Sequence, residues 1–206
     1  MSKKELRRFN VTELEVRKDT EDNKKIRGYA AVFDQETVIA GVFREVIRPK
    51  AFQRALNEKH DVRALVDHES SKILGRTKSG TLTLSEDKKG LYMEIDPADT
   101  QLTRDTMLMI ERGDIDQMSF GFIPKEVTWR DAEDGELELR EILDVDLFDV
   151  SVVTFPAYDG TEVSVRSAKE IRENEKPKVD NSDSEEQNDY DENENLKLKI
   201  QLAEAE

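Results

Sequence analysis

Short runs of apolar and β-branched residues, separated by turn residues, fill the chain from about Leu14 to Arg166. Such runs are typical of β-strands, and the Gly and Asp residues between them are typical of turns. The pattern predicts strands over 26–33, 41–47, 81–84, 91–95, 120–127, 137–145 and 150–155. Charged, glycine-containing segments separate two pairs of these runs, which predicts two hairpins. The run over 150–155 is the most apolar, so we expect a central strand there.

Two segments have the apolar spacing of helices. One is predicted to begin near Pro49, a residue that the first helical position tolerates. The other is predicted from about Asp99 or Thr100, either of which can cap it, to Arg112, where Gly113 ends it. Many strands with a few helices predict an α+β fold that is mainly β: an antiparallel barrel or sandwich decorated by helices.

Composition divides the chain into three parts. We assign residues 1–13 to a partly flexible N-terminal segment, 14–167 to a folded domain, and 168–206 to an acidic tail. Between Glu170 and Glu206 there are 13 acidic and 5 basic residues, which accounts for over half of the net charge of −15. That segment has almost nothing to bury and is predicted to be disordered. The apolar spacing over 196–202 predicts a short amphipathic end, too short to be a stable helix alone.

The bulk composition excludes several classes of function. The chain has no cysteine, so no disulfide points to an oxidising compartment. It has no secretory signal and no apolar run near the roughly 20 residues that cross a bilayer, so we expect a soluble, intracellular protein without a membrane partner. The acidity argues against binding to nucleic acid. The two histidines do not have a zinc spacing, and no phosphate or dinucleotide motif is present, so no metal or cofactor is predicted.

His68 is the strongest single candidate for chemistry. It follows the largely apolar run 62–66 and is expected near the end of a strand. Asp67 and Glu69 flank it, but neighbours on a strand point to opposite faces, so neither suits it as a partner. An imidazole titrates near neutral pH and suits a general base. His60 lies in a polar stretch and is expected to be a solvated loop residue.

Ser119 is the candidate nucleophile. It stands between Met118 and Phe120, where a hydroxyl needs a hydrogen bond to offset its desolvation. Gly121 leaves room for the close approach of a substrate or an oxyanion. There is no Gly-x-Ser-x-Gly motif, so no nucleophile elbow is predicted.

Asp149 is the most isolated acid in an apolar stretch, and a buried carboxylate needs a partner such as an imidazole. Asp144, Asp146 and Glu141 are alternatives on the same segment. Arg76 is a candidate to fix an acid or to help an oxyanion site, although a surface ion pair is its commoner role. Each candidate alone is more often structural, but together they supply the base, nucleophile and orienting acid of a serine hydrolase.

The order of these residues, with their surroundings, resembles the prohead (capsid maturation) proteases of tailed bacteriophages. The resemblance covers about Ile26 to Arg166, and the segments that carry it are 27–33, 45–52, His68 with 74–76, 118–122 and 149–157. It implies a serine endopeptidase with a fold distantly similar to the herpesvirus assembly proteases, a β-barrel ringed by helices.

The resemblance also implies roles for residues: His68 as the base and Ser119 as the nucleophile. The herpesvirus enzymes use a second histidine as third member, but His60 precedes His68, so we assign Asp149 instead. Many relatives have glutamate there, and aspartate is shorter. Gly121, Arg76 and Arg166 are candidates to form or support the oxyanion site.

The family implies a biological setting as well. Such a protease acts inside the immature procapsid, in the bacterial host cytoplasm. It cleaves the scaffolding segment of the major capsid protein and then itself, and its acidic tail would serve encapsidation or be cut. A homo-oligomer, such as the tight dimer of the herpesvirus enzymes, is left open. Two other classes stay open: a non-catalytic capsid scaffolding protein, and a small hydrolase of non-protein esters.

Overall fold

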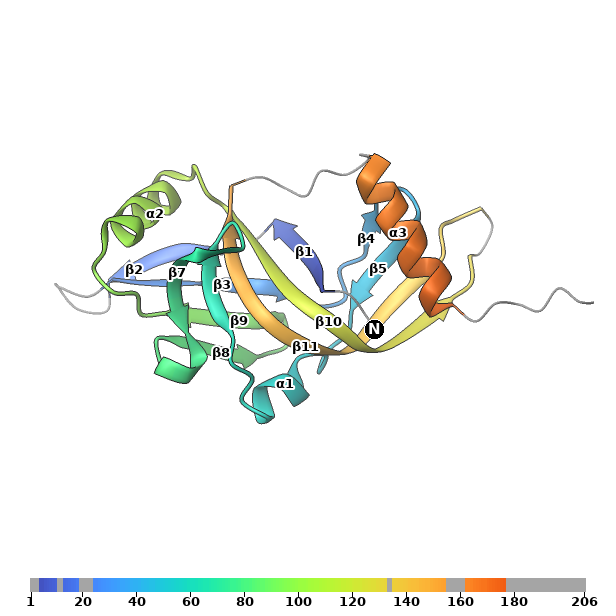
Figure 1. The fold of residues 1–206 in the computed structure, drawn as a ribbon, viewed down its shortest axis with the longest axis horizontal. Helices are drawn as coiled ribbons and strands as arrows, with labels where there is room; N and C mark the ends of the chain where they lie inside the picture. Colours follow the sequence, from blue (N-terminus) through green and yellow to red (C-terminus); the bar gives the residue numbers. More distant parts are fainter. Residues whose placement is uncertain (1–3, 11–12, 19–23, 133–134, 155–161, 177–206) are drawn as a thin grey trace, which may run out of the picture. The chain divides into compact units, whose positions relative to one another are not determined.

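The computed structural model describes residues 4–10, 13–18, 24–132, 135–154 and 162–176, whose path is drawn in Figure 1. The chain divides into two units, residues 1–170 and 171–206, and the fold below is that of the first. The strands are β1 (Glu5–Asn10), β2 (Glu15–Lys18), β3 (Lys24–Val32), β4 (Thr37–Ile39), β5 (Phe43–Ile47), β6 (Arg63–Val66), β7 (Glu69–Arg76), β8 (Leu82–Glu86), β9 (Gly90–Ile95), β10 (Gln117–Arg130) and β11 (Leu139–Val153). The helices are α1 (Gln53–Asn57), the 3-10 turn η1 (Thr77–Ser79), α2 (Gln101–Arg112) and α3 (Glu162–Glu175).

The described strands form two sheets. The first has the order β1-β10-β11-β5-β4, with β6 paired to β11 and β7 paired to β6. The second has the order β2-β3-β9-β8. The closed antiparallel barrel that we predicted is therefore wrong for the described part of the chain, although the mainly-β α+β class is right. Long β11 has β5 and β6 along the same edge, both parallel to it, and alternating patterns along a sequence do not reveal parallel pairing.

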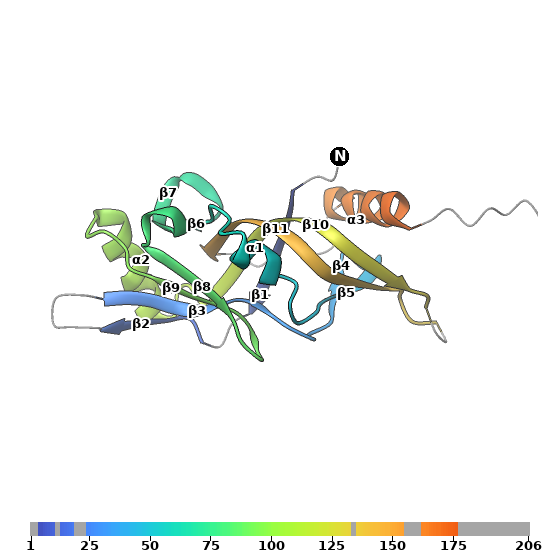
Figure 2. The same cartoon turned by 90° about the horizontal axis from the view of Figure 1, so that it is seen from below.

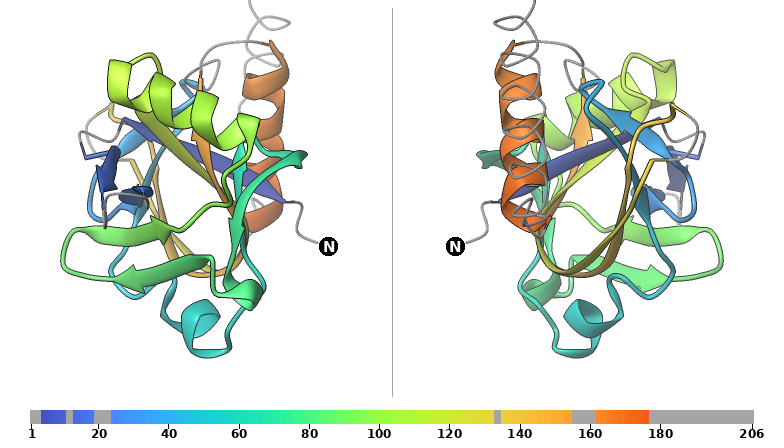
Figure 3. Two further views of the ribbon diagram at one scale, coloured as in Figure 1. Left: turned by 90° about the vertical axis from the view of Figure 1, so that its left-hand side faces the viewer. Right: turned by 90° about the vertical axis from the view of Figure 1, so that its right-hand side faces the viewer.

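The core contains apolar side chains from both sheets. Phe120 and Val150 come from the first sheet, and Met93 and Ile95 come from the second. Phe52, which precedes α1, meets the Phe120 ring edge-on at a centroid distance of 5.3 Å. Figure 3 gives the end-on views of this arrangement. The strands that carry the candidate residues are thus fixed by the main core.

The antiparallel pair β10–β11 is the longest ladder of the fold (Figure 1). It confirms the hairpin predicted around 131–135, and β11 contains residues 150–153 of the central strand predicted over 150–155, the last residue of which lies outside the described part of the chain. The two runs predicted at 137–145 and 150–155 belong to one strand, because the acids between them lie on the ladder rather than in a turn. Register shifts after Gly121 and on both sides of Glu126 act as bulges, which bend and twist a strand pair.

The two predicted helices are present, with different accuracy. The Thr100 hydroxyl accepts a hydrogen bond from the amide of Thr103 and caps α2, while Gly113 ends it with φ +80°. The first helix is shorter than predicted and begins at Gln53, because Lys50 has φ +79°, which interrupts any helix continuing from Pro49.

The two ends of the chain differ from the prediction. Residues 5–10 form β1 against β10, although the pattern placed the start of the fold at about Leu14. The beginning of the predicted tail is helical, since α3 continues to Glu175. Helix-favouring residues and opposite charges four apart, such as Arg166 and Glu170, support helix there. The rest of the tail, 177–206, lies outside the described residues. None of the described helices is long and apolar enough to span a membrane.

Candidate active site

His68 lies in the tight turn that joins β6 to β7. Val66 pairs with Glu69, so Asp67 and His68 are the two residues of the loop, and their φ angles are +51° and +58°. Positive φ at both positions defines a type I′ turn, the geometry that suits the twist of a hairpin. His68 was predicted near the end of a strand, and it lies two residues beyond the end of β6, in the turn of the hairpin.

Backbone and side-chain contacts of Asp67 hold this turn against β11. The Asp67 amide donates to the carbonyl of Val152 at 2.9 Å. Its Oδ1 accepts from the amide of Thr154 at 2.9 Å and from the Thr154 hydroxyl at 3.1 Å. Because β6 runs parallel to β11 with Val66 opposite Val152, the turn lies at the end of that pairing (Figure 2). The histidine is therefore anchored to the strand that carries the candidate acid.

The β10–β11 register places the other two candidates side by side. Ser119 pairs with Ser151, and Gly121 pairs with Asp149, so Ser119 and Asp149 are diagonal neighbours across the ladder. Both side chains are buried: Ser119 is 0% and Asp149 2% exposed. The sequence pattern put Asp149 and Ser151 on one face, and a 3.0 Å hydrogen bond between their side chains confirms it.

The structure brings His68, Ser119 and Asp149 together. His68 Nε2 lies 2.6 Å from Ser119 Oγ, and His68 Nδ1 lies 2.5 Å from Asp149 Oδ1. The His68 side chain is 9% exposed, so both contacts are shielded from water. An ionised carboxylate only accepts hydrogen bonds, so the Asp149 contact places a proton on Nδ1. Nε2 of the neutral ring is then free to accept a proton from Ser119.

Asp149 is held ionised by the groups around it. Burial raises the pKa of its carboxyl, but the hydrogen bonds and charges of His68 and Lys4 outweigh this, so that the pKa lies below its ordinary value. Lys4 Nζ lies 2.7 Å from Oδ2, on the side of the carboxylate that His68 does not use. Ser151 donates to Oδ1, the oxygen that also contacts His68. The carboxylate is thus fixed in both charge and orientation.

Gly121, predicted near the oxyanion, lies beside the acid. A Cβ at this position would be 2.3 Å from Asp149 Oδ2 and 2.6 Å from Lys4 Cε. The missing side chain therefore leaves room for the contact between Lys4 and Asp149.

The two arginines lie elsewhere. Arg76 pairs with Arg63 at the end of the β6–β7 hairpin away from His68, and its guanidinium forms an ion pair with Asp61. Arg166 is exposed on α3. Within the described residues, no contact joins either arginine to His68, Ser119 or Asp149.

The alternative acids have other partners. Asp144 and Asp146 accept hydrogen bonds from Arg54 at 2.6 Å and 2.7 Å. Glu141 accepts from Arg130 at 2.9 Å and also pairs with Arg48. The remaining histidine, His60, lies 3.1 Å from Glu58. Of the acids considered from sequence, Asp149 is the one that the described contacts place against His68.

Sequence reasoning missed three contributors to this site. Ser151 was on the face of Asp149 and could have been found from the same alternation. Lys4 had no signal, because it is 145 residues from Asp149 in the chain. The third is the backbone carbonyl of Arg7 on β1, to which Ser119 Oγ donates at 2.9 Å.

The arrangement contains the groups that nucleophilic catalysis needs. It contains a hydroxyl, an imidazole within hydrogen-bonding distance of it, and a carboxylate on the far ring nitrogen. No group of three or more metal-ligating side chains occurs among the residues that the structure describes.

Comparison with known proteins shows the family to which the chain belongs. Residues 12–177 match the family model of the caudovirus prohead serine proteases. The chain belongs to this prohead serine protease family. No curated protein matches the chain. Among solved structures, the chain is similar to the bacteriophage T4 capsid assembly protease, with a TM-score of 0.49 and 8% sequence identity, over 74% of this chain and 98% of that one. As a prohead protease, the chain is a phage capsid maturation peptidase.

Proposed function

We propose that the protein is a serine endopeptidase in which Ser119 is the nucleophile, His68 the general base and Asp149 the residue that orients His68. The observation that carries the proposal is the pair of contacts made by His68, 2.6 Å to the Ser119 hydroxyl and 2.5 Å to the Asp149 carboxylate. Such a base lies within reach of the proton that it must take.

The reaction follows the usual course of acyl transfer. His68 Nε2 takes the hydroxyl proton while Ser119 Oγ bonds to the scissile carbonyl carbon. The peptide C–N bond then breaks, and His68 gives its proton to the departing amine. Water, activated by the same imidazole, hydrolyses the ester and restores Ser119. Throughout the reaction the Asp149 carboxylate accepts a hydrogen bond from Nδ1–H of His68, and its negative charge stabilises the imidazolium form of His68.

The substrates we propose are the scaffolding segment of the major capsid protein and the protease itself. Family membership supports this, because prohead proteases are defined by the immature capsid in which they act. The site of action would then be the interior of the procapsid in the host cytoplasm. Proteolysis before assembly would destroy the scaffold, so such an enzyme needs a way of masking its site until assembly.

The test is co-expression with the cognate major capsid protein, followed by intact-mass analysis of both chains. Wild type should give a truncated capsid protein and a shortened protease, and Ser119→Ala and His68→Ala should give neither. Two variants serve as matched controls: Ser85→Ala, at an exposed position of β8, and His60→Ala, which removes the other histidine. Both should cleave as wild type does.

The results also separate the alternative functions. Robust cleavage by Ser119→Ala would refute the assigned nucleophile. Full-length chains in every sample, in the presence of assembled procapsids, would favour a non-catalytic scaffolding protein. Turnover of a simple ester without cleavage of the capsid protein would favour a small esterase.

A further inference from the structure

A hollow of about 720 Å³ lies between α1 and β8, which are neighbours in both Figure 1 and Figure 2. Part of its lining is apolar: Leu56 of α1, Leu82 and Leu84 of β8, and Leu147 of β11. Leu56 and Leu84 are only partly buried, so part of this apolar surface is open to solvent. A hollow of this size is within the range of sites that hold a ligand. We call it the α1–β8 groove.

The α1–β8 groove is separate from the candidate active site. Leu147 pairs with Phe122, and both side chains belong to the core cluster, so they point to the core face of the first sheet. Ser119 is an odd number of residues from Phe122 on β10 and therefore points to the opposite face. An occupant of the groove does not compete with a substrate at Ser119.

Basic side chains gather at one end of the groove. Lys59 and Lys78 line it and are exposed. The acid of the lining, Asp61, is already occupied, because it accepts from Arg76 Nε at 2.6 Å and lies 3.2 Å from Arg63 Nη2. The hydrogen bond from Arg76 and the charges of Arg63 and Lys78 lower the pKa of Asp61 to about 2. The four cations therefore outnumber the one carboxylate among them.

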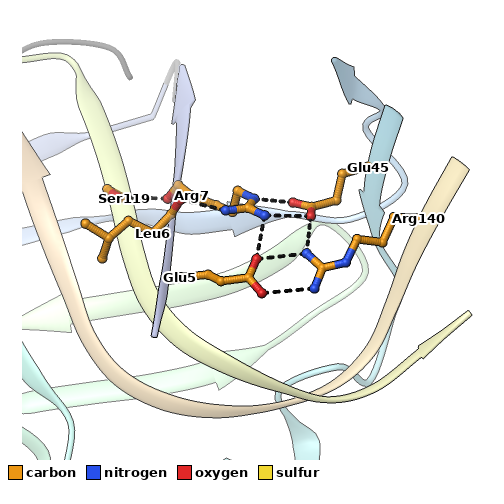
Figure 4. A network of polar contacts seen from close by, with 6 residues as sticks. All are labelled: Glu5, Leu6, Arg7, Glu45, Ser119 and Arg140. Atoms are coloured by element: carbon orange, nitrogen blue, oxygen red, sulfur yellow. Dashed lines mark hydrogen bonds and ion pairs between the residues drawn. The ribbon is translucent and has the colours of Figure 1, made fainter. Parts of the chain in front are cut away.

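This excess of positive charge is local. The whole chain carries a net charge of −15. The buried charges in Figure 4 are matched, since the two arginines Arg7 and Arg140 face the two glutamates Glu5 and Glu45. Beside the groove the match is missing, so the cations there attract a carboxylate from outside the chain.

Lys59 occupies a backbone position that does not favour lysine. It follows the end of α1 with φ +55°, and its amide donates to the carbonyl of Leu56 at 3.1 Å. Glycine or asparagine is usual at such a position. The neighbouring acid, Glu58, pairs with Arg54 at 2.9 Å. Strained residues concentrate at functional sites, and here the strained residue is a cation that lines the groove.

The chemistry of the α1–β8 groove decides between kinds of occupant. A phosphate or a nucleic acid backbone would use the lysines but would leave the leucines uncovered. An apolar ligand would cover the leucines but would leave the lysines without partners. A peptide that carries both glutamate or aspartate and leucine-sized side chains satisfies both parts of the lining, because apolar contact supplies the affinity and charge supplies the selectivity.

We propose that the α1–β8 groove docks an acidic peptide segment of a second protein, with leucine-sized side chains against Leu56 and Leu84 and carboxylates at Lys59 and Lys78. The docked segment binds on the face of the sheet opposite Ser119 and is not itself the segment that is cut. It holds its protein at the protease while another segment reaches the active site. The inference does not depend on the proposed role of Ser119.

The first experiment measures binding by fluorescence anisotropy in the full-length chain with Ser119→Ala, so that the probe stays intact. The probe is a fluorescent six-residue peptide, Glu-Leu-Glu-Glu-Leu-Glu. One matched probe has glutamine for every glutamate, and another has serine for every leucine. The acidic probe should bind about tenfold more tightly than either matched probe. Its advantage over the glutamine probe should shrink as salt is added.

Lysine variants test the charged end of the groove. Lys59→Gln combined with Lys78→Gln should raise the Kd of the acidic probe about fivefold, which is the loss expected for two exposed ion pairs. It should leave the Kd of the glutamine probe unchanged. The matched control combines Lys72→Gln with Lys125→Gln, at lysines of β7 and β10 whose side chains are exposed. This control has the same net charge and should bind as the parent protein does.

The second experiment locates the bound probe. The chain has no cysteine, so Thr83→Cys, at an exposed position of the groove, introduces a single thiol. An acidic probe with a terminal chloroacetyl group should alkylate this thiol about tenfold faster than the glutamine probe does, because binding holds the electrophile beside it. Leu108→Cys, at an exposed position of α2, is the matched control. It should react with the two probes at similar rates.

Several outcomes would overturn the inference. These are equal binding of the acidic and glutamine probes, unchanged binding after Lys59→Gln with Lys78→Gln, and equal alkylation of Thr83→Cys by the two probes. Displacement of the acidic probe by inorganic phosphate alone would indicate a simple anion site, and its loss on self-association of the protein would indicate a second copy as the occupant. Cleavage of the capsid protein by Ser119→Ala would refute the proposed function and leave these binding results unchanged.

Discussion

Two residues with positive φ, Asp67 and His68, show how much single residues contribute to this site. Aspartate and histidine tolerate this conformation better than branched residues do. Ser119 and Asp149 are diagonal neighbours across β10 and β11, and the turn places His68 Nε2 2.6 Å from Ser119 Oγ and His68 Nδ1 2.5 Å from Asp149 Oδ1. At this scale, the arrangement depends on the hydrogen bonds that each side chain donates or accepts and on the space left by the missing side chain of Gly121.

Asp149→Asn should lower kcat about 10³- to 10⁴-fold, because an amide favours the wrong tautomer of His68 and cannot stabilise its charged form. The measurement is the cleavage rate of the capsid protein by mass analysis over time. Asp146→Asn is the matched control: this acid lies on the same strand but pairs with Arg54, and the variant should cleave at the wild-type rate. Similar rates for both variants would contradict the role of Asp149.

Gly121→Ala should reduce activity more than stability. The new Cβ would lie 2.3 Å from Asp149 Oδ2, so the carboxylate must move away from His68. Gly80→Ala offers the opposite case, since nothing lies within 4 Å of its Cβ position and only its φ of +75° is strained. Gly80→Ala should cost about 1 kcal/mol in the free energy of unfolding and leave kcat unchanged. Unfolding midpoints and cleavage rates of both variants distinguish the two effects.

At the scale of elements, the β6–β7 hairpin delivers the histidine and β11 receives it. The sequence predicted the strand before His68 but not the turn, because Asp-His is not among the usual type I′ pairs. Contacts from β11 to Asp67 stabilise the turn in place of local preference. Likewise α1 begins later than the helix predicted from Pro49, since the backbone at Lys50 has a left-handed conformation. Tertiary contacts overrule local propensity in both elements.

Asp67→Ala should lower the cleavage rate, because the turn loses the carboxylate that accepts from the Thr154 amide and hydroxyl. Asp67→Asn should retain most of the activity, since asparagine tolerates positive φ and its side-chain oxygen still accepts hydrogen bonds. Cleavage rates measured beside circular dichroism at matched temperature would show whether the loss is local. Equal activity in the two variants would contradict this role for the Asp67 side chain.

At the scale of the whole molecule, paired carboxylates control the response to acid. Burial raises the pKa of Glu45, but the charges of Arg7 and Arg140 outweigh it and bring the pKa below the ordinary 4.5. Burial also raises the pKa of Glu141, but the hydrogen bonds and charges of Arg48 and Arg130 lower it by more, so that its pKa lies below the ordinary value. A carboxyl group whose pKa is lower in the folded state than in the unfolded state contributes its full stabilisation when the pH is above the pKa of the unfolded state. That stabilisation is lost as the pH falls through the pKa of the folded state.

We therefore expect the thermal midpoint to decrease as the pH is lowered below about 4.5, the ordinary pKa of glutamate. Glu45→Gln should flatten that decrease, because one of the responsible groups no longer titrates. Glu136→Gln, at an exposed glutamate, should retain the wild-type slope. Thermal unfolding followed by circular dichroism between pH 7 and pH 3 is the measurement. A midpoint independent of pH over this window would contradict the role of these pairs.

The sequence by itself determined the mainly-β class, the positions of most strands, helix α2 and the candidates His68, Ser119 and Asp149. These follow from local signals: apolar periodicity, caps, turns, and polar residues inside apolar runs. The resemblance of short segments to prohead proteases was confirmed by the family match.

Only the tertiary structure decided how the strands pair and what completes the site. The parallel pairing of β6 with β11 brings the His68 turn to Asp149, and the open sheets replace the predicted barrel. Lys4 and the carbonyl of Arg7 reach the site from the far end of the chain, across more than a hundred residues. Local sequence patterns do not predict such contacts, because the contacts depend on which strands form the edges of the folded sheets and can pair with a distant segment.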